Sequence, residues 1–366
     1  MRLLLAVLLL LPLFRMEAHA LSEADAASSV FGLEKVREAA PEQAREIGGE
    51  LNPARPYDAA GAIARLWARF LEEMKSQLAE NLRFAVSLIV LCFFCALATS
   101  LCADAKIRTL MEIAACCPAA WILTGAMDSL IAETTEAIYT LSDYSKAALP
   151  VVYTAAAASG APSSAAARYA AVSFALDVLL SGMQRLILPL ISAYLSATVA
   201  NTLFPNAMLK AAASLSRWAA KTAMTGASLV FTTYIGMTGA ISGAVDAAAV
   251  KTTRSLISGA LPVVGGMISD VSAMVLSAAG IVRSCAGAFG LVAVCAICLG
   301  PFAMLWVKTL LLKAVSLAAE AAPCPRLSAL FAGISGALAM LMGLLGACGI
   351  LLFLSFSLGM RAVSGV

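Results

Sequence analysis

Residues 82–103 read LRFAVSLIVLCFFCALATSLCA, and this stretch decides the class of fold. Arg83, near its start, is the only charged residue in it. A transmembrane helix needs about 20 consecutive apolar residues to cross a hydrocarbon core of about 30 Å. The stretch therefore predicts a membrane-spanning helix, and the question becomes how the rest of the chain is arranged around it.

The composition divides the chain into a polar region and an apolar body. Of all 366 residues, 61% are hydrophobic and 13% are charged, whereas soluble domains carry about 25% charged residues. Charged residues make up 18 of the 61 positions in 21–81 but only 26 of the 285 positions in 82–366. We expect a polar head, 21–81, followed by a multi-span membrane domain, 82–366. The net charge of +3, without a basic stripe, argues against nucleic acid as a partner.

The first 20 residues have the features of a signal peptide. Arg2 is followed by the apolar run 3–14, and Ala18-His19-Ala20 fits a cleavage site. Cleavage would place residues 21–81 outside the cytoplasmic membrane, and an uncleaved anchor is the alternative. His19 is the only histidine, so the mature chain would have no imidazole for catalysis or metal binding. We therefore expect no enzyme activity, no cofactor and no metal site.

Residues 59–81 predict an amphipathic helix that ends the polar head. Its apolar positions are spaced three and four apart: Ile63, Leu66, Trp67, Phe70, Leu71, Met74 and Leu78. The helix runs directly into the first span. It would lie on the membrane or dock on a partner, or it would simply form a stalk.

Further apolar segments predict an all-α polytopic membrane protein with about six to eight transmembrane or re-entrant helices. We expect a second span at 107–127, an acidic outer loop over 128–143, and two short spans in 165–204 with a turn near Gly182 to Arg185. An interfacial helix over 207–221 and spans near 222–245, 285–307 and 327–358 follow. The side of the C-terminus is left open.

A second informative stretch is GALPVVGGMISD, residues 259–270. Pro262 ends or kinks a helix, and Gly265 and Gly266 allow a turn. Asp270 then suits the beginning of the next helix. The stretch predicts a re-entrant helix–turn–helix, which would serve as a conduit or subunit contact, or as a structural hairpin at the interface.

The sequence ALPVV occurs twice, at 148–152 and at 260–264. A true repeat would pair breaks near Pro150 and Pro262, an arrangement typical of secondary transporters and channels. Chance similarity in a chain rich in alanine and valine is the alternative.

Two further sets of residues are candidates for function. Charges in or beside apolar segments would line a conduit or simply mark span ends: Asp177, Arg185, Asp246, Arg254, Asp270, Arg283 and Glu320. Gly236, Gly239 and Gly243 have the spacing of a helix-packing face. The ten cysteines all lie between Cys92 and Cys348, and we interpret them as small apolar side chains rather than redox sites.

The segment SGAVDAAAVKTTRSLISGALPVVGGMISDVSAMVLSAAGIVRSCAGAFG, residues 242–290, resembles the stage III sporulation protein AE family of endospore-forming bacteria. The positions that carry the likeness are Thr252, Thr253, Arg254, Pro262, Val263, Gly265 and Asp270. The resemblance implies a multi-pass protein of the mother-cell-derived membrane around the forespore. It also implies other stage III sporulation membrane proteins as partners in a secretion-like channel complex, and the chain could itself form a homo-oligomer. A secondary transporter or channel subunit of unrelated role is the alternative.

Overall fold

The computed structural model describes residues 32–51, 57–102, 104–159, 162–260, 265–322 and 324–361. For 105, 162–164, 235–260, 265–275 and 361 it describes the backbone alone. Within these ranges the chain is helical and contains no strand. The helices are α3 (Leu33–Glu38), α4 (Glu42–Gly48), α5 (Ala59–Ser100), α6 (Ala105–Ala158), α7 (Pro162–Gly182), the π-helix η2 (Met183–Ile187), α8 (Leu188–Leu203), α9 (Ala207–Ala260), α10 (Gly265–Ala321) and α11 (Pro325–Arg361).

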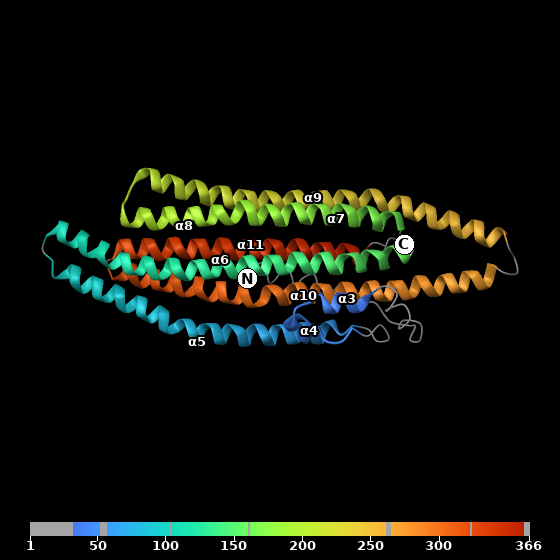
Figure 1. Ribbon diagram of the computed structural model, residues 1–366, viewed down its shortest axis with the longest axis horizontal. Coiled ribbons are helices and arrows are strands. Elements are labelled where there is room, and N and C mark those ends of the chain that lie inside the picture. Colours follow the sequence, from blue (N-terminus) through green and yellow to red (C-terminus); the bar gives the residue numbers. More distant parts are fainter. Residues whose placement is uncertain are drawn as a thin grey trace.

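The long helices run antiparallel and form an elongated bundle (Figure 1). The α5–α6, α8–α9 and α10–α11 connections lie at one end of the bundle, on the left in Figure 1. Helices α3 and α4 lie toward the other end, as do the last turns of α6 and α11. The distal parts of α9 and α10 extend beyond the other helices on that side.

Helices α10 and α11 form the centre of the bundle and pack against each other and against α6. In their most apolar parts 61% of α10 and 50% of α11 is buried, compared with 28% of α5 and of α6. Gly290 of α10 lets the Phe356 ring of α11 approach its Cα, and that ring stacks on Tyr144 of α6 at 5.9 Å. The high hydropathy of α10 and α11 therefore reflects burial inside the protein as well as a location in a membrane.

Five helices of the described residues are long and apolar enough to cross a membrane: α5, α6, α7 with α8, α10 and α11. The all-helical prediction is thereby confirmed, whereas the count of six to eight spans stays a prediction. At 1.5 Å per residue, the 54 residues of α6 extend about 81 Å and the 57 residues of α10 about 86 Å. Since a hydrocarbon core is about 30 Å thick, much of the bundle lies outside any bilayer that it crosses.

The polar head is packed onto the bundle. The Tyr57 hydroxyl donates to the Gly48 carbonyl at 2.9 Å, and Arg65 of α5 donates from Nε to the Ile47 carbonyl at 2.9 Å. The Tyr57 ring also meets Phe289 of α10 edge-on at 6.4 Å. Burial raises the pKa of the Tyr57 hydroxyl. The expected helix over 59–81 is confirmed, and it continues into the first span as the single 42-residue helix α5.

Helix α6 overturns two expectations, because it runs without interruption from Ala105 to Ala158. The acidic segment 128–143 is part of this helix and not a loop. The break predicted at Pro150 is also wrong. A proline removes one backbone donor, but packing on α11 holds this segment in place: the Tyr153 hydroxyl donates to the Ser355 carbonyl of α11 at 3.1 Å, and Val152 is fully buried.

The turn expected near Gly182 to Arg185 is wrong as well. Residues 183–187 form a π-helical turn that joins α7 and α8 into one continuous rod. A π-helical turn absorbs one extra residue without ending the helix. Met183 and Ile187 stay buried in the bundle as a result.

We expect Gly290→Ala to lower the stability of the bundle. The added methyl group would lie 2.5 Å from the buried Phe356 ring, and overpacking of this kind costs about 1–3 kcal/mol. The measurement is thermal unfolding of the purified protein in detergent. Gly280→Ala on the same helix is the matched control, because nothing lies within 4 Å of its added methyl group. Equal melting temperatures for both variants would contradict this packing.

Candidate functional site

A buried ion pair joins three helices near the end of the bundle that carries the short connections. Arg326 of α11 lies with its Nε 3.5 Å from a carboxylate oxygen of Glu112 on α6. The same guanidinium donates to the Thr202 carbonyl at 3.2 Å, at the C-terminal end of α8. Both side chains are largely buried, at 22% and 13% exposure. The guanidinium thus neutralises the Glu112 carboxylate and also hydrogen-bonds to carbonyls left free at the C-terminal end of α8.

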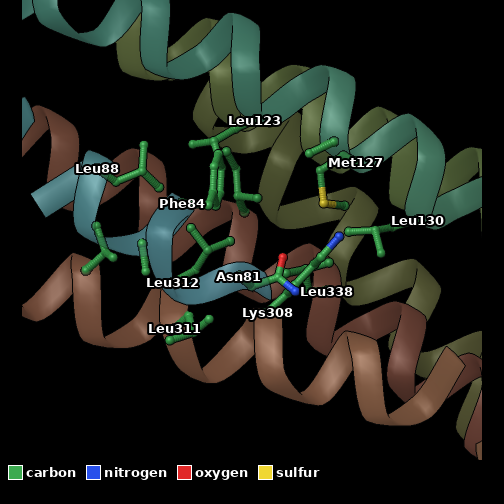
Figure 2. A pocket seen from close by; sticks show the side chains of 14 residues that line it. Asn81, Phe84, Leu88, Leu123, Met127, Leu130, Lys308, Leu311, Leu312 and Leu338 are labelled. Carbon is green, nitrogen blue, oxygen red and sulfur yellow. The ribbon is translucent and has the colours of Figure 1, made fainter. Parts of the chain in front are cut away.

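Further along the bundle a cavity of about 270 Å³ opens between α5 and α6. Figure 2 shows its lining of leucines, Phe84 and Met127. The polar side chains in this lining are Asn81 of α5 and Lys308 of α10. The Lys308 side chain extends from α10 toward α6 and passes the Asn81 amide (Figure 2). We call this feature the α5–α6 groove.

Two acidic side chains interact with the lysine of the α5–α6 groove. Glu133 of α6 and Glu80 of α5 both interact electrostatically with Lys308, and among the described residues Lys308 forms no ion pair within 4.0 Å. Asp128 and Glu136 are exposed on the same helix as Glu133. From residue 109 to 145, α6 carries five acidic residues and no lysine or arginine. The charged side chains on this part of α6 are therefore all acidic.

The sequence-predicted break around Pro262 lies between α9 and α10, and residues 261–264 are outside the described residues. Asp246 and Arg254 lie on α9, and Gly265, Gly266 and Asp270 lie in the first turns of α10, all in segments where only the backbone is described. The flanking helices α9 and α10 contain 54 and 57 residues. Because the residues between them lie outside the described ranges, the expected re-entrant geometry stays a prediction. Pro150 lies within α6 and does not mirror this break.

The other predicted residues are separate from one another. Asp177 of α7 is exposed and lies 3.7 Å from Lys146 of α6. Arg283 is buried and donates to the Ser159 hydroxyl at 3.1 Å, beyond the C-terminal end of α6. Arg185 is exposed on the π-helical turn. The packing glycines Gly236, Gly239 and Gly243 lie on the part of α9 whose side chains are not described.

Sequence reasoning missed the ion pair and the groove. Glu112 and Arg326 are 214 positions apart, and each alone looks like a charge at the end of a span. A usable signal existed for Lys308, because it is the first charged residue after the charge-free stretch 284–307 and lies at the edge of the predicted span near 285–307.

The interior of the described bundle is filled with apolar side chains, including Leu123, Ile138, Phe331 and Leu344, each at most 2% exposed. These side chains pack closely, as in the interior of a soluble protein. Among the described residues no group of three or more His, Cys, Asp or Glu could hold a metal ion. The cysteines are all free thiols; Cys92 and Cys95 are buried, and Cys295 and Cys298 are partly buried within α10.

Comparison with known families now decides the identity. The sequence profile described as stage III sporulation protein AE matches residues 58–362. The chain belongs to the stage III sporulation protein AE family. The matched region of this AE-family chain begins at Asp58, the residue that caps α5, and ends one residue after α11, so the family resemblance coincides with the long-helix bundle. No curated protein and no solved structure matches the chain.

We expect Arg326→Gln to destabilise this AE-family protein by about 1–3 kcal/mol, because it leaves the largely buried Glu112 carboxylate without its cation. Thermal unfolding in detergent measures the loss, and the double variant Glu112→Gln with Arg326→Gln should recover part of it. Asp177→Asn, which breaks an exposed ion pair, is the control and should stay within about 1 kcal/mol. An equal loss of stability in Asp177→Asn and in Arg326→Gln would contradict the role of the buried pair.

Proposed function

We propose that this protein is a non-catalytic, multi-pass component of a channel complex that joins the mother cell and the forespore during endospore development. The observation that carries the proposal is the family match over the whole bundle. Five apolar helices support a location in the membrane. Other stage III sporulation membrane proteins are the proposed partners, and the mother-cell-derived membrane is the proposed location.

The closed interior of the bundle supports a role in assembly. Because apolar side chains fill the described core, material would pass between chains and not through one of them. The protein would then contribute to a conduit as one subunit of a larger structure. A secondary transporter, the alternative function, would need a polar binding site at the middle of the membrane.

The charge distribution supports one orientation of the bundle. The short connections at one end of the bundle are each followed within about four residues by lysine or arginine: Lys106 and Arg108, Lys210, and Arg326. Cytoplasmic segments are enriched in lysine and arginine, so this end would face the cytoplasm. The packed head and the C-terminal end of α11 would then lie on the extracytoplasmic side.

We expect cysteine labelling of intact cells to report this orientation. In a cysteine-free version, an impermeant maleimide should modify Glu34→Cys in the head and Glu136→Cys on α6. It should modify Asn206→Cys only after the cells are permeabilised. All three positions are exposed in the structure, so access depends on the side of the membrane. Labelling of Asn206→Cys in intact cells would reverse the orientation.

Deletion of the chain in its endospore-forming host should abolish heat-resistant spores, and forespores should stall after engulfment. Expression of the intact chain in the deletion strain should restore them, which heat-resistant colony counts and a late forespore reporter would measure. Normal sporulation combined with lost uptake of a solute would favour the alternative transporter function.

A further inference from the structure

The exposed side of α9 has the opposite charge to the exposed side of α6. Between residues 178 and 245 the chain carries four lysines and arginines and no acidic residue. Three of them, Lys210, Arg217 and Lys221, are exposed on α9. We call these three residues the cationic edge. On α6 the exposed acids Asp128, Glu133 and Glu136 form the acidic edge.

The two edges lie on different sides of the bundle. Helix α9 packs on α7, α8 and α11, whereas α5 packs on α10, α6 and α4. In Figure 1, α9 runs along the upper margin and α5 along the lower margin. Within the acidic edge Glu133 interacts with Lys308 beside the α5–α6 groove, and α6 and α9 pack on α7 and α8 rather than on each other.

The two edges lie at the same height along the bundle axis. The Arg217 guanidinium is 5.9 Å from the centroid of the Tyr194 ring, and the Tyr194 hydroxyl donates to the Gly333 carbonyl of α11. The next residue of α11, Ile334, lines the cavity together with Leu123 of α6. On α6, Asp128 lies between Met127 and Leu130, which line the same cavity, and Lys221 lies about one turn, 6 Å, beyond Arg217 along α9.

The outer side of α9 exposes polar and charged side chains among apolar ones. Ser214 and Lys221 are exposed on the same helix as Leu215, Leu229 and Val230. A lysine facing hydrocarbon is costly, and small and polar residues favour contact between helices in a membrane. Trp218, 64% exposed between Arg217 and Lys221, adds a residue type common in protein interfaces.

We infer that the cationic edge of one chain docks against the acidic edge of a second copy of the same chain. Because the two edges are different surfaces, the contact is heterologous, and repeated contacts close into a ring when the rotation allows it. Matched opposite charges at equal height would fix the register of neighbouring copies. The contact itself does not depend on the proposed function. Only the role of the ring, which would enclose a passage between the chains, rests on it.

The experiment is crosslinking in membranes that contain the full chain without its native cysteines. Thr222→Cys lies beside Lys221 and Ser129→Cys beside Asp128, and both positions are exposed. A chain that carries both cysteines should form a ladder of crosslinked species with a short bismaleimide, whereas each single-cysteine chain should stay monomeric. Thr222→Cys combined with Ser284→Cys, exposed on α10, is the control and should form no ladder.

Charge reversal tests the electrostatic match. Lys221→Glu and Asp128→Lys should each reduce the crosslinked fraction by about tenfold or more, because like charges then oppose each other. The double variant Lys221→Glu with Asp128→Lys should restore it. Failure of that restoration, a ladder from Thr222→Cys alone, or no ladder at all would overturn the inference.

A further readout separates a protein contact from a lipid contact. The second measurement is thermal unfolding in phosphatidylglycerol vesicles of the native chain and of the triple variant Lys210→Gln, Arg217→Gln and Lys221→Gln. If no ladder forms and the vesicles stabilise the native chain but not the triple variant, anionic lipid covers this edge and the inference fails. Crosslinking is measured in vesicles and is independent of spore formation. If no ladder forms but the chain restores spore formation, the interface is rejected and the proposed function is kept. If the ladder forms but the chain is not needed for spore formation, the interface is kept and the proposed function is rejected.

Discussion

The close packing of α10 against α11 is the contact on which the rest of the bundle depends. Both helices are apolar over most of their length and are the most buried of the membrane-span candidates. Small residues let them approach: Gly290 lies against Phe356, and Gly349 lies against Cys298. The remaining helices surround this pair, so their buried sides are apolar and their outer sides carry the charges.

Burial of that pair explains why apolar length alone misjudges the topology of this chain. Apolar sequence signals a membrane because lipid and protein interior both exclude water. In α10 and α11 the same signal comes from a core that continues well past the thickness of a bilayer. Helix α6 likewise is longer than a bilayer is thick, and its acidic residues from Asp128 to Asp143 are exposed on its outer side.

Charges in this protein fall into internal and external groups with different roles. Arg326 and Glu112 are largely buried together and connect α6, α8 and α11, so they hold these three helices to one another. Lys308 lies at the α5–α6 groove between apolar side chains and outer acids. The remaining cations and acids are exposed on separate edges, and they give the bundle two chemically different sides.

The sequence by itself determined the helical class, the family and the amphipathic helix that leads into α5, because periodicity and composition are local properties. It could not determine that Pro150 continues a helix, that residues 183–187 form a π-helical turn, or that Glu112 meets Arg326. Each of these depends on neighbours from distant parts of the chain: Tyr153 bonds to α11, Met183 packs on Cys348, and the ion pair joins residues 214 positions apart. Only tertiary packing brings those groups together, and it also separates the acidic edge from the cationic one.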